Sequence, residues 1–261
     1  SSWTDISNTS TTYTSGTLTQ TTRFRAVVQS GVCPTANSTY TTVTVSPSSV
    51  GGNVTGGTTI CSGSSSGTLT LSGHTGSVVK WQSSVSPFST WTDITHTGTT
   101  YTSSALTQTT RFRAVVQSVP CAAANSSYTT VTVEPALNAG TIGSNQSKCA
   151  PADPDAFTNQ VPASGGLAPL NYQWYWATVS GGPYNLISGA NGSTYDAPGG
   201  LGATRYYVRA VTSSGVCGSK YSNEIVVIVN PARTDEIKTL EDKIACQNSS
   251  VTMNYETVTN A

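Results

Sequence analysis

The segment TQTTRFRAVVQS occupies residues 107–118, and the same letters occupy residues 19–30. Within the later copy, Phe112, Ala114 and Val116 alternate with polar or charged neighbours along most of its length. Successive side chains of a β-strand point to opposite faces of its sheet. The segment therefore predicts a strand that buries Phe112 and Ala114 in a core and turns its arginines to the other face.

The identity extends beyond this strand to two copies of a longer unit. Trp3 and Trp91, like Cys33 and Cys121, lie 88 residues apart, and no gap interrupts the match between them. A more divergent third copy ends in TRYYVRAVTSSGVC at residues 204–217 and needs about two inserted residues for alignment. A period near 90 residues exceeds the 20–50 residues of solenoid repeats and suits independent β-sandwich domains.

The repeats divide the chain into four parts: the C-terminal half of a repeat at 1–46, complete repeats at 47–134 and 135–231, and the start of a further repeat at 232–261. Strands are expected in the second part at 58–61, 67–72, 78–83, 90–94, 99–103, 109–118 and 124–133. Seven short strands predict an all-β fold of tandem immunoglobulin-like sandwiches. Because the proline-containing junctions are short, the domains are expected to stack in a rod.

Two tryptophans are expected at the centres of these sandwiches. Trp81 lies in the third expected strand, the place where immunoglobulin-like folds hold a central Trp, and Trp174 matches it in the next repeat. We expect both to pack in the core with Phe112 and Ala114.

The six cysteines form two classes by their place in the repeat. Cys61, Cys149 and Cys246 follow a short strand, and Cys33, Cys121 and Cys217 follow the arginine-bearing strand. One member of each class per repeat predicts the disulfides Cys61–Cys121 and Cys149–Cys217, with Cys33 and Cys246 pairing outside the chain. Disulfides indicate a compartment outside the cytoplasm.

A second pairing stays open. The pairs Cys33–Cys61, Cys121–Cys149 and Cys217–Cys246 have spacings of 28, 28 and 29 residues and use all six cysteines. We disfavour it because a strand and a domain junction separate the members of each pair. About ten extended residues span over 30 Å, whereas bridged Cα atoms lie within about 7 Å of each other.

The composition argues against several classes of function. Charged residues make up 9% of the chain, and 12 basic residues balance 12 acidic ones. This is far below the roughly 25% of an average soluble protein. Nucleic acid and other partners held by charge are therefore not expected. The sequence also lacks a run of about 20 apolar residues, so no membrane insertion is expected in this segment.

Catalytic and cofactor motifs are missing from the sequence. Its histidines, His74 and His96, both lie in the second part, so they cannot serve a function that all repeats share. There is no GxSxG, P-loop or dinucleotide fingerprint, and no zinc-ligand spacing. We expect no catalytic residue, cofactor or metal. The one weak exception is Asp153 and Asp155, two carboxylates in a proline-rich loop that suit calcium.

Aromatic residues offer one candidate binding surface. Trp91, Tyr101 and Tyr128 are three aromatic residues that could form a strip for sugar rings, with Trp91 as the main glycan contact. The competing interpretation, which we favour, is that Trp91 covers the edge of the sheet and Tyr101 fills the core.

The second repeat resembles a known family. Its segments GGTTICSGSSSGTLTLSGHTGSVVKWQSS, WTDI and TTYTSSALTQTTRFRAVVQS are similar to the immunoglobulin-like repeats of giant secreted proteins of Bacteroidetes, including SprB-type gliding-motility adhesins. The resemblance spans the whole chain, strongly to about residue 134. It implies type IX secretion, attachment at the outer cell surface and a filament of stacked domains that contacts the substratum.

These observations favour a non-enzymatic stalk segment of a surface-attached filamentous adhesin, serving gliding motility and surface adhesion. Its expected partners are neighbouring repeats of the same long chain, surface polysaccharide and other filaments. Two alternatives remain. One is an array of carbohydrate-binding modules, and the other is a non-catalytic arm of a large secreted enzyme.

Overall fold

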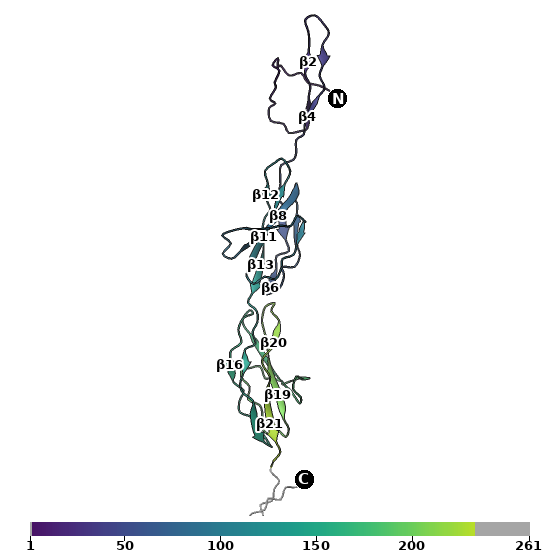
Figure 1. Cartoon of the computed structure of the whole chain (residues 1–261). Helices are drawn as coiled ribbons and strands as arrows, with labels where there is room; N and C mark the ends of the chain where they lie inside the picture. Colours follow the sequence, from purple (N-terminus) through teal and green to yellow (C-terminus); the bar gives the residue numbers. More distant parts are fainter. Residues whose placement is uncertain (1, 233–261) are drawn as a thin grey trace, which may run out of the picture. The chain divides into compact units, whose positions relative to one another are not determined.

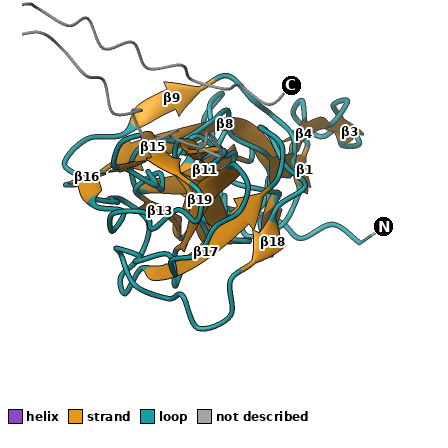
Figure 2. Cartoon of the chain, turned by 90° about the horizontal axis from the view of Figure 1, so that it is seen from below, coloured by secondary structure: helices purple, strands orange, loops and turns teal. Residues whose placement is uncertain are grey.

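A computed structural model describes residues 2–232 (Figure 1). Within this range every regular element is a β-strand and none is a helix, as the orange strands and teal loops of Figure 2 show. The chain divides into two compact units, Ser1–Val133 and Glu134–Ala261. The predicted all-β sandwich class is confirmed. The predicted continuation into another repeat, with Cys246, falls on residues 233–261, outside the described residues.

The first part of the chain contains only fragments of a sandwich. Its strands are β1 (Thr22–Phe24), β2 (Val27–Val28), β3 (Ala36–Asn37) and β4 (Thr41–Val43), paired as β1–β4 and β2–β3. They correspond to the last strands of the next repeat. No strands of residues 2–47 pack against them from the opposite side. Phe24 is accordingly half-buried, whereas its counterpart Phe112 is 2% exposed.

The second repeat is a complete two-sheet sandwich. Its strands are β5 (Asn53–Thr55), β6 (Thr59–Cys61), β7 (Leu69–Ser72), β8 (Ser77–Val85), β9 (Thr92–Ile94), β10 (Thr100–Tyr101), β11 (Thr110–Gln117), β12 (Ala124–Asn125) and β13 (Thr129–Glu134). One sheet has the order β10-β7-β5, and the other has the order β6-β13-β11-β8-β9, with β12 paired to β11. The expected strand at 124–133 is thus divided in two, and β5 was not expected.

The third repeat follows the same plan with a less regular first sheet. Its strands are β14 (Thr141–Ile142), β15 (Gln146–Cys149), β16 (Asn159–Val161), β17 (Asn171–Ala177), β18 (Asn185–Leu186), β19 (Arg205–Thr212), β20 (Ser219–Tyr221) and β21 (Ile225–Asn230). The main sheet has the order β15-β21-β19-β17-β18, with β20 paired to β19. Strand β15 runs parallel to β21.

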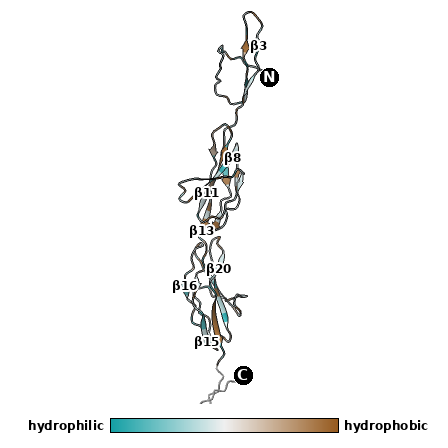
Figure 3. Ribbon diagram, viewed as in Figure 1, coloured by the Kyte–Doolittle hydropathy of each residue, from teal (hydrophilic) through white to brown (hydrophobic). Residues whose placement is uncertain are grey.

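Each complete repeat has one tryptophan at its centre. Trp81 and Trp174 are both 0% exposed, and each donates its indole N–H to a loop carbonyl at 2.9 Å, that of Gly98 and Gly192 respectively. Phe112 and Ala114 lie in the same core cluster as Trp81. In Figure 3 the strands carry both hydrophobic (brown) and hydrophilic (teal) residues. Alternation along the strands thus directs one set of side chains inward.

The chain enters and leaves each complete sandwich at opposite ends. In the second repeat, Ser118 after β11 donates its backbone N–H to Ser49 Oγ (2.9 Å), on the incoming segment. At the other end of β11, Thr109 Oγ1 accepts from the backbone N–H of Val133 (3.0 Å), on the outgoing strand. An eight-residue strand spans about 25 Å. We call these the incoming and outgoing ends of the repeat.

The third repeat has the same polarity. Cys217, beyond β19, contacts the carbonyl of Pro135 on the incoming segment (Sγ–O 3.2 Å). At the start of β19, Thr204 Oγ1 accepts from the backbone N–H of Val229 (3.0 Å) on the outgoing strand.

Candidate functional site

The outer face of β11 carries the most distinctive side-chain cluster of the second repeat. Arg111 and Arg113 project from this face because they alternate with the core residues of the strand. Aromatic side chains from two other segments lie beside them: Phe88 and Trp91 from the β8–β9 connection, and Tyr128 from the β12–β13 connection. We call these five residues the arginine–aromatic strip.

Guanidinium groups and aromatic rings alternate within the strip. Arg111 lies between two rings, with its Cζ 3.9 Å from the ring centroid of Phe88 and 4.5 Å from that of Tyr128. Arg113 lies over Trp91 at 4.1 Å, and the rings of Trp91 and Tyr128 are 6.4 Å apart. Contacts of this length are attractive because the ring face is electron-rich. Each guanidinium therefore lies over at least one ring.

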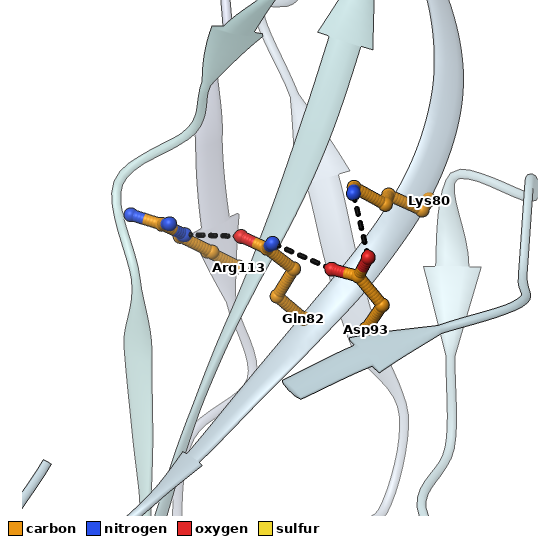
Figure 4. A network of polar contacts seen from close by, with 4 residues as sticks. All are labelled: Lys80, Gln82, Asp93 and Arg113. Carbon is orange, nitrogen blue, oxygen red and sulfur yellow. Dashed lines mark hydrogen bonds and ion pairs between the residues drawn. The ribbon is translucent and has the colours of Figure 1, made fainter. Parts of the chain in front are cut away.

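A polar network extends from one end of the strip (Figure 4). Arg113 Nε donates to Gln82 Oε1 at 2.8 Å, and Gln82 Nε2 donates to Asp93 Oδ1 at 2.7 Å. Lys80 Nζ lies 2.7 Å from Asp93 Oδ2. The hydrogen bonds from Gln82 and Lys80 lower the pKa of the Asp93 carboxyl. Asp93 is therefore neutralised by Lys80 rather than by an arginine.

The same stacking recurs one repeat earlier. Arg23 lies over Tyr40 at 4.5 Å and Arg25 lies over Trp3 at 4.1 Å. These four residues precede Arg111, Tyr128, Arg113 and Trp91 by one repeat period. We call them the first-repeat strip. In the third repeat, Arg205 lies over Trp176 at 4.1 Å, and the buried Arg209 lies over Tyr172 at 5.1 Å and over Trp174 at 6.0 Å.

The arginines of the strip are uncompensated by acidic groups. Across residues 2–232 the ion pairs are Lys80–Asp93 and Lys148–Asp155, so neither Arg111 nor Arg113 has a carboxylate partner in that range. The side chain of Arg111 makes no hydrogen bond there, and its Nε is buried without a partner. The strip therefore presents two cations beside exposed aromatic surface.

Sequence reasoning found only part of this arrangement. Trp91 does lie against Tyr128, but Tyr101 contacts the core residues Trp81 (ring centroids 5.5 Å) and Phe112 (5.8 Å). The sequence places the arginines of the strip only on the outward face of the strand. Both arginines, the Trp and the Tyr recur together in two repeats, and this shared recurrence is the feature of the sequence that indicates the contacts.

A second polar cluster belongs to the third repeat alone. Glu224 accepts hydrogen bonds from Ser180 Oγ (2.6 Å), Tyr184 Oη (2.7 Å) and the backbone N–H of Gly181 (3.0 Å). Burial, followed by the hydrogen bond to Glu224, raises the pKa of Tyr184 to about 12. The cluster ties the loop after β17 to the segment before β21.

Asp153 and Asp155 are the carboxylates that the sequence offers to calcium. Asp155 Oδ1 lies 2.9 Å from Lys148 Nζ, so this carboxylate already has a cationic partner. In the described part of the chain, three or more His, Cys, Asp or Glu side chains nowhere gather in a way that could hold a metal ion. His96 Nε2 lies 2.6 Å from the carbonyl of Thr100, and its ring is 5.4 Å from that of Tyr101.

The cysteine pairing predicted within each repeat is wrong. Cys61 and Cys217 are disulfide-bonded, whereas Cys121 and Cys149, the partners predicted for them, are thiols, as is Cys33. The two classes lie at opposite ends of a repeat. Cys149 pairs in register with Asn230 at the outgoing end of the third repeat, whereas Cys217 lies at the incoming end.

The length of the central strand separates the two classes within a repeat. Cys121 lies 3.5 Å (Sγ–O) from the carbonyl of Pro47 at the incoming end, and the strand with Cys61 pairs with β13, which leads to the outgoing end. The roughly 25 Å of β11 lies between them, against a limit of about 7 Å between bridged Cα atoms. The alternative pairing is wrong as well, because it also requires Cys121 and Cys149.

One protein-family model matches nearly the whole described chain. Its description is "Domain of unknown function (DUF8696)", and it matches residues 1–47, 50–135 and 138–231. This chain belongs to the DUF8696 family. The three matches mean that DUF8696 domains follow one another along the sequence.

Several solved multidomain structures are similar to this DUF8696 chain at low sequence identity. The fibronectin(III)-like modules of CbhA from Clostridium thermocellum are 12% identical, with a TM-score of 0.30, over 72% of this chain and 100% of that one. The FN1–FN3 domains of chicken CNTN1 are 12% identical, with a TM-score of 0.31, over 74% and 71%. Extracellular domains 3–5 of Drosophila OTK are 14% identical, with a TM-score of 0.28, over 73% and 66%.

No curated protein matches the DUF8696 chain. Among residues 2–232 there is also no helix long and apolar enough to cross a membrane.

Proposed function

We propose that this chain is a non-enzymatic stalk segment of a secreted filamentous adhesin that is attached to the outer cell surface and serves gliding motility and surface adhesion. The observation that carries the proposal is the polarity of each complete repeat. Because the chain enters at one end and leaves at the other, each added repeat contributes the length of its central strands, about 25 Å, to the reach of the array.

Two further observations support an extracellular stalk. Cys61 and Cys217 are disulfide-bonded, and such bonds persist in oxidising compartments outside the cytoplasm. The cores of the two complete repeats are filled by buried aromatic and aliphatic side chains around Trp81 and Trp174. A stalk requires domains that stay folded under load, and dense cores with covalent bonds supply that stability.

Small-angle scattering of the purified chain tests the stalk. A compact chain of 261 residues has a radius of gyration of about 18 Å. We expect a value well above this, and a value near 18 Å would contradict the proposal. The surface location is tested separately by labelling intact cells with an antibody against the chain. Labelling that needs permeabilised cells would exclude attachment to the outside.

A further inference from the structure

We propose that the arginine–aromatic strip is a binding site for an acidic polysaccharide. The carboxylate or sulfate groups of the polymer would bind the guanidinium edges of Arg111 and Arg113, and its sugar rings would lie against Tyr128. The inference deepens the proposed function, on which it rests for the extracellular setting. It gives the adhesin a ligand class and a site.

Charge is the first step of the argument. The chain has no net charge, so it does not attract polyanions as a whole. The strip nevertheless carries two cations without a carboxylate partner in residues 2–232, and the nearby carboxylate of Asp93 is occupied by Lys80 and Gln82. The strip thus carries a local excess of positive charge on one face of the sheet, where an anion is the complementary ligand.

The second step is the fixed orientation of the two guanidinium groups. Arg111 is clamped between Phe88 and Tyr128, and Arg113 is held by Trp91 and by its Nε hydrogen bond to Gln82. The Nη groups of both arginines donate to no group in residues 2–232, so they remain available for two parallel hydrogen bonds to a carboxylate or sulfate. Because the side chains are already ordered, binding loses little further side-chain entropy.

The third step distinguishes a polysaccharide from a small anion. Tyr128 is 51% exposed beside the guanidinium groups, so it offers a ring on which the apolar face of a sugar can lie. The first-repeat strip places Arg23, Arg25 and an exposed Tyr40 at equivalent positions. A polymer with regularly spaced anions can occupy both strips, and binding at two linked sites greatly strengthens the overall attachment.

Binding of the whole chain to immobilised dextran sulfate tests the proposal, with unsulfated dextran as the neutral match. We expect binding to the sulfated polymer only. Arg111→Gln with Arg113→Gln should weaken it about tenfold, the effect of losing a charge-assisted hydrogen bond. The matched control is Arg205→Gln with Lys220→Gln in the third repeat. It removes the same charge and an equally close stack on Trp176, and should change binding less than twofold.

The remaining outcomes decide between ligand classes. Equal binding to polyglutamate and dextran sulfate would overturn the polysaccharide in favour of an acidic protein. An equal loss in the control pair would show general charge attraction and overturn the site.

Near-ultraviolet circular dichroism checks that each variant is folded. Arg111→Lys with Arg113→Lys, which keeps the charge, should bind more tightly than the glutamine pair, and equal binding would contradict the role of charge. An extended particle in scattering that ignores dextran sulfate would overturn the ligand and leave the stalk intact.

Discussion

Arg209 shows how a single side chain can change the interior of a repeat. In the sheet register it lies opposite Trp174, as Ala114 lies opposite Trp81, yet it is 0% exposed. Its guanidinium donates to the carbonyl of Ala139 (2.8 Å) and to Asn159 Oδ1 (2.7 Å). Burial lowers the pKa of this guanidinium. Where the second repeat has the small apolar side chain of Ala114, the third repeat thus has a buried arginine that hydrogen-bonds to neighbouring segments.

We expect Arg209→Met to destabilise the third repeat by at least about 2 kcal/mol. Methionine fills much of the volume but leaves several buried acceptors without a donor, and each unsatisfied group costs about 1–3 kcal/mol. The change in the free energy of unfolding is measured by denaturant titration, with hydrogen exchange of the β19 amides as the readout. Arg205→Met is the control on the same strand, since Arg205 is only half-buried and lies over Trp176. Similar losses in both variants would contradict the role given to the buried bonds.

Trp81 provides a test of the second core. Trp81→Ala should cost about 3–5 kcal/mol, because a large side chain with no exposed surface leaves a cavity. Trp91→Ala removes a stack worth about 0.5–1 kcal/mol and serves as the comparison. Calorimetry resolves the transition of this repeat. An unchanged transition temperature for Trp81→Ala would disprove the central position of this residue.

Tyr184 should titrate unusually late. Its pKa is raised to about 12 by burial and then by its hydrogen bond to Glu224. A raised pKa means that the folded state holds the proton more tightly than the unfolded state, so stability falls as the pH rises from 10 to 12. Tyrosine-labelled NMR follows the ring. Glu224→Gln should lower the Tyr184 pKa without restoring it fully, and an unchanged value would exclude the contribution of Glu224.

At the scale of the strand, a serine interrupts the edge of each main sheet in the same way. Ser126 and Ser222 each accept a hydrogen bond from a backbone N–H of the central strand, at 2.8 and 3.0 Å, and Ser38 accepts one from Ala26, between β1 and β2, at 2.9 Å. Each hydroxyl also donates to the carbonyl of the following residue. The side chain takes the place of a backbone partner where the edge strand breaks.

Ser126→Ala should therefore cost about 1–3 kcal/mol, because the buried N–H of Ala114 loses its acceptor. The exposed Ser104 provides a neutral control, Ser104→Ala, in the same repeat. The hydrogen-exchange rate of the Ala114 amide measures the loss of this hydrogen bond directly. Unchanged protection at this amide in the Ser126 variant would contradict the bond.

The sequence predicted the strands well, but it did not predict the correct alignment of the third repeat with the second or the state of the cysteines. Alternation at period two located β7 to β11 because burial of one face leaves that pattern. Strand β5 escaped because Asn53–Thr55 is too short to show one. The sequence of the third repeat aligns with the second by residue identity. In the structure, Thr204 Oγ1 and Ser222 Oγ make the same backbone contacts as Thr109 and Ser126. This structural alignment places Arg209 opposite the core tryptophan.

The predictions of the arginine–aromatic strip and of the cysteine pairing failed for a different reason. Contacts such as Arg113 with Trp91 join side chains from separate strands, and a single strand pattern does not encode them. The predicted pairing compared cysteines by their order in the repeat. Whether two cysteines can meet depends on which end of β11 each lies at, and that is a property of sheet topology.

At the scale of the whole molecule, cysteine chemistry gives a direct prediction. Alkylation of the native chain without reductant should label Cys33, Cys121 and Cys149 and leave Cys61 and Cys217 unlabelled. Peptide mapping by mass spectrometry measures this, and labelling after reduction is the control. Labelling of Cys61 or Cys217 before reduction would contradict the oxidised state of these residues.

Each repeat is stabilised mainly by interactions between uncharged groups, including the serine and threonine hydroxyls that complete its sheets. Only two ion pairs occur among residues 2–232. Dissolved salt weakens exposed charge interactions but hardly affects neutral hydrogen bonds or apolar packing in this way. Rising ionic strength should therefore loosen the proposed hold on an acidic polymer while the scaffold stays folded. Salt would act on this protein as a release signal that separates attachment from stability.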